Sequence, residues 1–503
     1  MFSPDPSTPG RLELLLLCAA GLVFVADCVG LLTAGPATLS GLPLDDAWIH
    51  LAYARSVAES GIYGYNPGEW QNGSTAPLWS LLLALPLKAG LEPAVASRSL
   101  GLLAGGSALL LAWALARDLG GPRLAGLVLV GLVIEPWMAV LAVSGMETQA
   151  AMAAALGCTL AVRRERFWAG GIALACAGLL RPELALLVPA ALVAAPNARA
   201  RIALLLPPSL AGGGWLAFGL IVAGHPLPTA FRTKVVVGFD PLGQLASVAG
   251  LFSATGREWG GPGWWVLALA LGAGALGIAA MLRFGRLSAL LVGVPFAILG
   301  FYVASLPLGV SAEPIVQASV QSIYYARYLL LLLPWMTLLA AAGALWLFDR
   351  APGVSGRGAV VAATVLVLLA TATVQRGALK EAYVANTAEI EQLHGGMAAA
   401  IAAKLPPDAV VGISDAGRLR CAVPQRLIDL TGLNSSQLLD ALDVVPLLQA
   451  EGLTHAAIWP DWHREVLADP RVRVVPLGRT RVARNTIAAR PELMLYAVEF
   501  VDP

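Results

Sequence analysis

Charged residues are scarce in this chain, where they make up 13% of 503 residues, whereas an ordinary soluble domain has about 25%. Hydrophobic residues reach 57% and the mean hydropathy is +0.73, so lipid is the expected solvent for most of the chain. The 33 basic and 32 acidic residues nearly cancel. No bulk field of one sign therefore favours a nucleic acid partner.

Cysteine is also rare: the chain has five scattered cysteines and no CxxC pair. Neither a disulfide framework nor a zinc site is therefore expected. Glycine-rich stretches such as Gly101–Gly106 lack the Gly-Lys-Ser/Thr ending of a phosphate-binding loop, and we infer no nucleotide site. No internal repeat is evident either. That absence disfavours the repeat-built secondary transporters.

Long apolar runs, in contrast, fill the first three quarters of the chain. They predict an all-α polytopic membrane domain over residues 1–375, with about eleven transmembrane helices plus interfacial helices. The runs lie near 14–33, 95–116, 123–142, 147–162, 167–180, 183–195, 201–223, 262–282, 287–305, 328–348 and 358–375. Several are shorter than the ~20 residues of an upright span, so their boundaries are soft.

Basic residues fall in alternate short loops, which the positive-inside rule assigns to the cytoplasm. They are Arg117 and Arg123, Arg163 to Arg166, Arg199 and Arg201, Arg283 and Arg286, and Arg350 and Arg357. The pattern predicts a multi-pass protein of the cytoplasmic (inner) membrane with a cytoplasmic N-terminus. A first outward loop then spans 34–94, and the run 77–87 inside it is too short to cross and is expected to be interfacial or re-entrant.

The last part of the chain, residues 376–503, has a lower apolar density and short β-rich runs between helical stretches. Strands are predicted near 409–413, 426–430, 455–459, 472–477 and 493–501, after a helix over 384–405. This pattern predicts a small soluble α/β domain on the outward, periplasmic or extracytoplasmic side.

Two adjacent carboxylates open the amphipathic segment Leu44–Arg55, which is expected to lie as a helix on the membrane surface. In one interpretation, Asp45 caps the helix and Asp46 interacts favourably with the helix dipole. The other is that one carboxylate is a general base, or that both hold a divalent cation such as Mg²⁺ or Mn²⁺. The local sequence does not separate the two.

Several motifs recur in a fixed order along the chain. In the first outward loop they are Asp45-Asp46, Arg55, Gly61, Asn66-Pro67-Gly68-Glu69 and Thr75-Ala76-Pro77-Leu78-Trp79. Further along they are Ser144-Gly145-Met146-Glu147-Thr148, Leu180-Arg181-Pro182-Glu183, Pro228 to Lys234, Arg327-Tyr328, Asp415-Ala416-Gly417 and Ile428 to Asn434.

This series resembles GT-C class glycosyltransferases, polytopic enzymes that take sugars from polyprenyl-phosphate carriers, and is most similar to the mycobacterial-type arabinofuranosyltransferases and their bacterial relatives. One departure is that relatives often carry Glu-x-x-Thr before the Trp motif, whereas Gln71–Thr75 contains no acid. That acid is therefore not available here as a metal ligand.

The resemblance implies that a carboxylate of the Asp45-Asp46 pair is the catalytic base. A departing phosphate also needs cations, for which outward-facing Lys234, Arg232 and Arg327 are candidates at predicted helix ends. Snorkelling of these side chains to lipid headgroups is the alternative.

Further substrate-site candidates are Arg55, Glu147, Arg181, Glu183 and Tyr328. Arg181 and Glu183 bracket Pro182 where two short spans meet, and a structural salt link is as good an interpretation as a substrate contact. Glu147 joins the acidic cluster or stabilises a helix N-terminus. His50 and His225, as lone histidines, are expected to be structural.

Taken together, the residues and the resemblance predict an inverting glycosyltransferase. It would move a sugar, possibly arabinofuranose, from a polyprenyl-phosphate donor to a glycan, lipid or protein acceptor at the outer face of the membrane. A mannosyl, hexosyl or aminosugar transferase of the same class is the first alternative, and a secondary transporter is the second.

Overall fold

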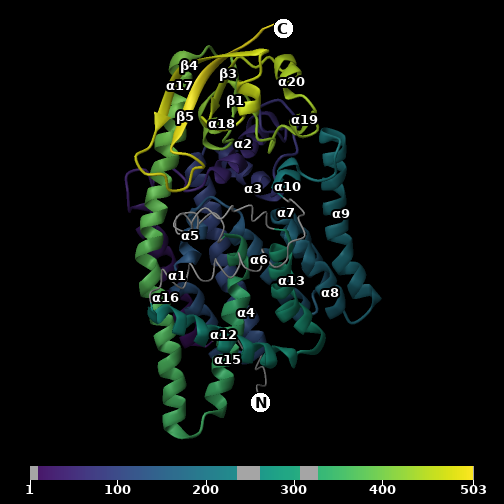
Figure 1. Cartoon of the computed structure of the whole chain (residues 1–503). Helices are drawn as coiled ribbons and strands as arrows, with labels where there is room; N and C mark the ends of the chain where they lie inside the picture. Colours follow the sequence, from purple (N-terminus) through teal and green to yellow (C-terminus); the bar gives the residue numbers. More distant parts are fainter. Residues whose placement is uncertain (1–9, 235–260, 306–326, 502–503) are drawn as a thin grey trace.

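The computed structural model describes residues 10–234, 261–305 and 327–501. A tall helical body carries a small α/β domain at one end, and the N-terminal helix begins at the opposite end (Figure 1). Parts of two predicted outward loops, 235–260 and 306–326, lie outside the described residues.

Helices are the regular secondary structure of the described part of the membrane domain, as the apolar runs predict. The earlier ones are α1 Arg11–Leu32, α2 Asp45–Ser60, α3 Pro77–Lys88, α4 Pro93–Ile134, α5 Trp137–Val143, α6 Thr148–Arg163, α7 Phe167–Leu180 and α8 Leu187–Ala194. The later ones are α9 Ala198–Ala223, α10 Thr229–Lys234, α12 Gly261–Leu282, α13 Val294–Ser305, α15 Leu333–Arg350 and α16 Gly353–Ile390.

Each of the predicted apolar runs falls on a helix, and the chain is a multi-pass membrane protein. Among the described residues, six helices are long and apolar enough to cross a bilayer, or seven if the bent pair α5 and α6 forms one span. Shorter apolar helices, including α7 and α8, account for other predicted spans. The full count of about eleven crossings stays a prediction.

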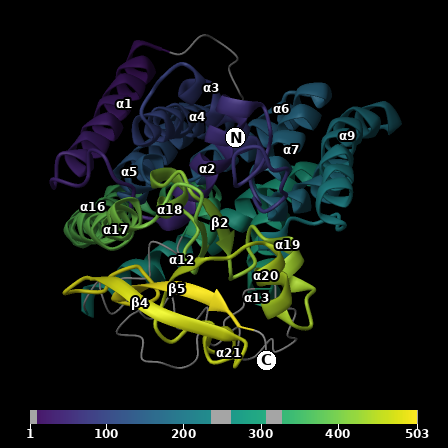
Figure 2. The same cartoon turned by 90° about the horizontal axis from the view of Figure 1, so that it is seen from above.

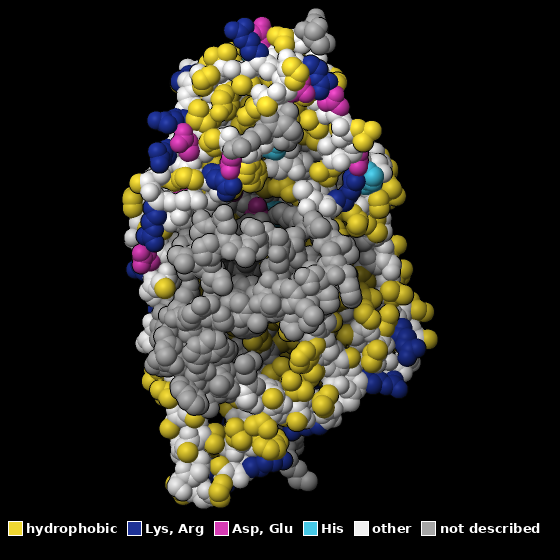
Figure 3. Space-filling view, viewed as in Figure 1, with side chains coloured by type: hydrophobic (Ala, Val, Ile, Leu, Met, Phe, Trp, Pro, Cys, Tyr) yellow, Lys and Arg dark blue, Asp and Glu magenta, His cyan; other side chains and the backbone are white. Residues whose placement is uncertain are grey.

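The predicted basic loops gather at one end of the helical body. α4 breaks at Gly121, whose backbone is not helical, and the turn there brings Asp118 within 2.7 Å of Arg164 in the loop after α6. Arg163, the last residue of α6, lies over the ring of Phe284 in the loop after α12. In Figure 3, Lys and Arg side chains are seen at the lower end and on the upper domain, and hydrophobic side chains are frequent on the described surface to the right of and below the grey area.

The first outward loop does not lie on an open membrane surface as expected. Its helix α2 packs against α3 on one side and against α18 (Arg418–Ala422) of the C-terminal domain on the other. Leu51 belongs to the core of the helical body, whereas Tyr53 belongs to the core of the C-terminal domain. The apolar side chains of α2 therefore pack into the cores of two domains and do not face the lipid.

The C-terminal domain contains one five-stranded sheet, and all five predicted strands are confirmed. Its elements are α17 Gly396–Lys404, β1 Val410–Ile413, α18, β2 Arg426–Asp429, α19 Ser436–Leu439, α20 Val444–Ala450, β3 His455–Ile458, α21 Arg464–Leu467, β4 Val472–Arg481 and β5 Glu492–Phe500. The strand order is β2-β1-β3-β5-β4, with β2, β1 and β3 parallel and β5 and β4 antiparallel. Seen from above, this domain lies over α2 and beside α16 (Figure 2).

The two domains are joined by an unbroken helix and not by a linker. α16 has 38 residues, and it runs from the basic end of the body into the C-terminal domain (Figure 1). The predicted boundary at 375/376 therefore falls inside α16.

Candidate active site

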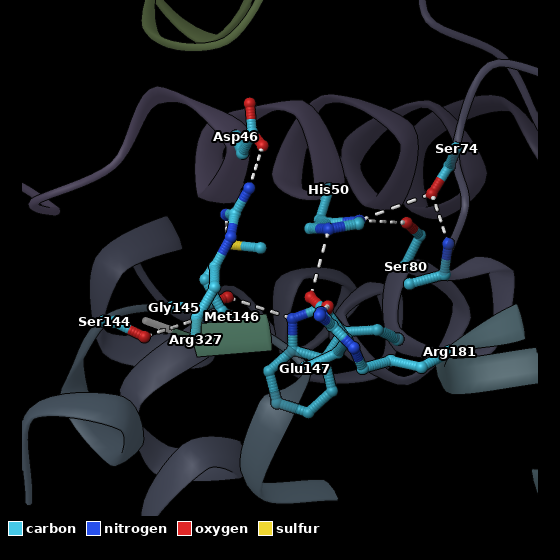
Figure 4. Close-up of polar contacts among 12 residues, drawn as sticks. Asp46, His50, Ser74, Ser80, Ser144, Gly145, Met146, Glu147, Arg181 and Arg327 are labelled. Atoms are coloured by element: carbon cyan, nitrogen blue, oxygen red, sulfur yellow. Dashed lines mark hydrogen bonds and ion pairs between the residues drawn. The ribbon is translucent and has the colours of Figure 1, made fainter. Parts of the chain in front are cut away.

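A cavity lies beneath α2, where the helical body meets the C-terminal domain. It encloses about 940 Å³, including space open to solvent. Six of the predicted site residues line it: Asp46, Glu147, Arg181, Glu183, Arg327 and Tyr328. They come from α2, from the α5–α6 turn, from the turn after α7 and from the segment before α15, so the fold brings together residues that are far apart in sequence (Figure 4).

Helical spacing orients the cavity face of α2. Asp46 and His50 are four residues apart and therefore lie on the same face of the helix. Below them, the α5–α6 turn approaches closely at Gly145, where a Cβ atom would come within 2.9 Å of Ala47 and Leu42. Gly145 also has φ +84°, a conformation that other residues rarely adopt. This glycine allows Glu147 to lie under His50.

Asp46 pairs with a buried arginine. Nη2 of Arg327 lies 2.6 Å from Oδ2 of Asp46, and the same nitrogen donates to the hydroxyl of Tyr328 at 3.2 Å. Arg327 is only 2% exposed. A guanidinium held at this depth is costly unless it is paired, so Asp46 and Arg327 form one unit in this structure.

Arg181 is the centre of a second ionic group. Its Nη1 lies 2.6 Å from Oε1 of Glu147 and its Nε lies 2.7 Å from Oε1 of Glu183. Tyr302 of α13 donates its hydroxyl to Glu183. The Nη2 of Arg181 has no hydrogen-bond partner among the residues that the structure describes. The structure thus contains the salt link predicted for Arg181 and Glu183, and it also places that link on the cavity wall.

The ring of Tyr328 connects the two ionic groups. The guanidinium of Arg181 lies 4.8 Å from its centroid and that of Arg327 lies 5.0 Å away. An electron-rich face between two cations lowers their mutual repulsion. Tyr328 therefore holds both arginines at one side of the cavity.

His50 was expected to be structural, yet it lies on the cavity wall. Its Nε2 is 3.4 Å from Oε2 of Glu147, and its Nδ1 is 3.3 Å from the hydroxyl of Ser74 and 3.4 Å from that of Ser80. Figure 4 shows His50 between these groups. The four-residue spacing from Asp46 was the available sequence signal for it. Tyr302 and Ser74 also line the cavity, and no local motif marks either residue.

Asp45 has a different role from that of its neighbour. Its carboxylate accepts hydrogen bonds from the backbone N–H groups of Gly417 and Arg418, both at 2.7 Å. The N-cap of α2 is Leu44, so the interpretation of Asp45 as the cap of its own helix does not hold. Asp45 instead binds the backbone at the start of α18 and docks the C-terminal domain onto α2. Burial raises the pKa of Asp45 to about 6.

The docking contact depends on a glycine. A Cβ atom at Gly417 would lie 2.0 Å from the carbonyl oxygen of Asp45. Arg418 next to it makes two hydrogen bonds with Glu391, at 2.9 and 3.0 Å, and lies 4.7 Å from the ring of Trp48. The Asp415-Ala416-Gly417 motif is therefore a docking turn.

None of the other predicted cationic residues is among the described residues that line the cavity. Arg55 is exposed, pairs with Glu59 at 2.7 Å and donates to the carbonyl of Cys421. Arg232 pairs with Asp440 of the C-terminal domain at 2.8 Å, and Asp440 also meets His225 at 3.0 Å. The side chain of Lys234 lies outside the described residues.

A divalent cation shared by Asp45 and Asp46 was one of the interpretations of this pair, and the arrangement of the two side chains does not favour it. One carboxylate binds backbone N–H groups and the other binds Arg327, so they do not converge as ligands. Within residues 10–234, 261–305 and 327–501, no group of three or more His, Cys, Asp or Glu side chains is placed to hold a metal ion. We derive no chemical step through a metal.

Comparison with known sequences gives limited information. A family model described as a domain of unknown function, DUF8728, matches residues 383–491. That range covers the end of α16 and most of the C-terminal domain. No curated protein sequence matches the chain.

Solved structures are more informative. ArnT from Cupriavidus metallidurans, bound to undecaprenyl phosphate, has a TM-score of 0.55 and 16% identity over 96% of this chain and 97% of its own. The Archaeoglobus fulgidus oligosaccharyltransferase, tethered with an acceptor peptide, scores 0.53 with 12% identity over 89% and 69%. Arabinofuranosyltransferase AftD from Mycobacteria scores 0.50 with 16% identity over 98% of this chain and 42% of its own. All three are GT-C glycosyltransferases, and the chain has the GT-C fold.

Proposed function

We propose that the protein is an inverting glycosyltransferase that moves a sugar from a polyprenyl-phosphate donor to an acceptor at the outer face of the cytoplasmic membrane. The observation that carries this proposal is the cavity in which Asp46 lies 2.6 Å from Arg327, with Arg181 on the same wall. It pairs a carboxylate with cations, which is what sugar transfer from a phosphate needs. The similarity to ArnT solved with undecaprenyl phosphate extends over nearly the whole chain.

Asp46 is the proposed general base. The acceptor hydroxyl gives its proton to the Asp46 carboxylate while its oxygen attacks the anomeric carbon of the sugar. The bond from that carbon to the phosphate oxygen breaks, and polyprenyl phosphate leaves with the bonding electrons. Attack from the face opposite the phosphate inverts the anomeric configuration.

Arg327 links the base to the leaving group in this scheme. A guanidinium has five N–H donors in a planar fork, so Arg327 can keep its bond to Asp46 and still donate to a phosphate oxygen. Arg181 has its Nη2 available for a second phosphate oxygen, since no described residue accepts from it. Lys234 is the last residue of α10, and the first turn of that helix lines the cavity through Ala230 and Phe231. We propose that Lys234 adds a third positive charge.

Arabinofuranose is the sugar that we propose first, because the motifs resemble the arabinofuranosyltransferases most. A hexose or aminosugar remains the alternative within the same reaction class. The outward orientation of the cavity rests on the basic loops at the opposite end of the body.

The proposal is tested with the purified full-length chain in lipid nanodiscs. Native mass spectrometry with a panel of polyprenyl-phosphate pentoses, hexoses and aminosugars should detect one retained donor. Arg327→Gln should lose that donor, whereas Arg232→Gln, which removes an arginine paired outside the cavity, should keep it. Failure to retain any donor would contradict the proposal and favour the transporter alternative.

A further inference from the structure

A second, polar cavity adjoins the candidate active site on the side of the C-terminal domain. It encloses about 490 Å³, including space open to solvent. We call it the outer cavity. Its wall is built by Trp70, Gln71 and Asn72 of the first loop, by the end of α9, and by Ser436 and Gln437 of the C-terminal domain.

The two cavities share a lining residue. Asn434 lines both of them, and the consecutive residues Asn72 and Gly73 line the outer cavity and the active-site cavity respectively. Asn434 is fixed there because its Oδ1 accepts from the hydroxyl of Tyr53 at 3.0 Å and its Nδ2 donates to Asp429 at 2.9 Å. A molecule in the outer cavity is therefore next to the proposed reaction centre.

The chemistry of the outer cavity suits a neutral polyol. No Lys, Arg or His is among the described residues that line it, so it is unsuited to a phosphate. The one acid among the described lining residues, Glu69, is paired with Arg426, whose Nε lies 2.6 Å from its Oε1 and which also pairs with Glu451. Carboxamide and hydroxyl side chains make up much of the rest of the wall, and these groups exchange hydrogen bonds with sugar hydroxyls in both directions.

Asn72 is the unexplained polar group in this wall. It is 2% exposed, and in the described part of the chain neither Oδ1 nor Nδ2 of its carboxamide has a hydrogen-bond partner. Its backbone, in contrast, is satisfied, because its carbonyl accepts from the N–H of Thr229 at 2.9 Å. Orphaned buried groups are rare and destabilising, and a bound ligand would supply the partner that the described residues do not give this carboxamide.

Trp70 adds an aromatic surface at the rim of the outer cavity. It is 53% exposed although it is a large hydrophobic residue. Its ring packs edge-on against Phe218, and Phe218 stacks on Trp215. These contacts hold the exposed indole ring in one orientation. The electron-rich face of an indole attracts the slightly positive C–H groups on one face of a sugar ring.

We propose that the outer cavity is the acceptor subsite and that it binds a neutral, hydroxyl-rich glycan unit. The proposal rests on the glycosyltransferase function and makes it more specific, since it chooses a glycan among the glycan, lipid and protein acceptors. Asn72, Gln437 and the Trp70 ring provide the contacts. The acceptor hydroxyl then reaches Asp46 past Asn434.

The proposal is tested by binding and not by transfer, so that it does not depend on knowing the donor. The full-length chain in nanodiscs is titrated with neutral arabino-, manno-, galacto- and gluco-oligosaccharides and followed by saturation-transfer-difference NMR and calorimetry. At least one series should bind saturably. Trp70→Ala and Gln437→Ala should each weaken that binding about tenfold, and Trp70→Phe should restore most of it.

Two matched variants serve as controls. Trp168→Ala removes another tryptophan that is 53% exposed, and Gln449→Ala removes an exposed glutamine of α20; both should bind the oligosaccharide like the wild type. Absence of saturable binding from every series would overturn the proposal. Unchanged affinity in both Trp70→Ala and Gln437→Ala would overturn it too, as would binding of only peptides or lipid headgroups.

Asp46→Asn separates this proposal from the proposed function. This variant should bind the oligosaccharide with wild-type affinity while it transfers no sugar. A protein that retains no polyprenyl-phosphate donor but still binds glycans through Trp70 would refute the transferase and leave a glycan site. A protein that transfers sugar without contacts in the outer cavity would refute the subsite alone.

Discussion

On the side of the active-site cavity, α2 presents Asp46 and His50 to charged groups of the helical body; on the opposite side, it presents Asp45 to backbone N–H groups of the C-terminal domain. The two aspartates are adjacent in sequence and identical in chemistry. Their partners differ, because one faces a guanidinium beside an open cavity and the other faces the start of a helix. One turn of helix thus holds a reaction group and a docking group.

The largest expected effect separates the two aspartates. Asp46→Asn should lower the transfer rate about 10²–10⁴-fold, because it removes the proposed base. Asp45→Asn should lower that rate less than about tenfold, since it changes only the docking contact and leaves the base in place. Both rates are measured with the retained donor in nanodiscs, with folding checked by circular dichroism. Equal losses in the two variants would contradict the division of roles.

The next effect concerns docking alone. Gly417→Ala places a methyl group against the backbone of Asp45 and should destabilise the docked C-terminal domain by about 1–3 kcal/mol. Hydrogen exchange of residues 415–422 measures this loss as reduced protection. Gly377→Ala in α16 is the matched control, because a Cβ there meets nothing within 4 Å. Undiminished protection in Gly417→Ala would show that the close approach is not needed.

A smaller effect is the pH dependence of docking. Burial raises the pKa of Asp45 to about 6. Burial by itself lowers the pKa of His394, but the hydrogen bond to Asp415 and the nearby charge of Asp45 raise it above its usual value of 6.5. Both groups therefore bind protons more tightly when the domain is docked.

Docking should weaken as the pH rises from about 4 to above 7, first through Asp45 and then through His394. Hydrogen exchange of residues 415–422, corrected for intrinsic rates, should show greater protection at pH 5 than at pH 8. Asp45→Asn should remove the part of this change below pH 6 and keep the part due to His394. Equal protection at both pH values would refute this reasoning.

The smallest expected effect is that of Arg55→Ala. Arg55 does not line the active-site cavity, its pair with Glu59 is exposed, and its hydrogen bond to the carbonyl of Cys421 in α18 is 3.3 Å long, so the loss should be about 0.3–0.5 kcal/mol. Thermal unfolding and the transfer rate should both stay close to wild type. A loss of donor binding in this variant would place Arg55 in the substrate path instead.

Much of the fold could be predicted because its signals are local. Apolar runs, alternate basic loops and the five β-rich runs depend on neighbouring residues, and the structure places helices and strands where they indicate. The burial of α2 between two domains could not be predicted. The amphipathic pattern from Trp48 to Arg55 indicates one apolar face but does not say that a distant domain covers the other.

The site could be predicted only in part for the same reason. The ordered motifs identified Asp46, Glu147, Arg181 and Arg327, which meet in the cavity. They did not separate Asp45 from Asp46, since the partners of both, Gly417 and Arg327, are more than 250 positions away along the chain. His50 had only its four-residue spacing from Asp46 as a signal, and Asn72 had no local signal, because the partners around both side chains come from distant parts of the fold.

The unbroken α16 has a mechanical consequence. A helix of 38 residues is about 57 Å long, and it is the covalent connection on which the C-terminal domain stands. A change of 5° in its tilt would move its upper end by about 5 Å, more than the length of the hydrogen bonds that hold Gly417 to Asp45. Because tilt follows the match between helix and hydrocarbon thickness, we expect membranes of different thickness to alter how firmly this domain closes over α2.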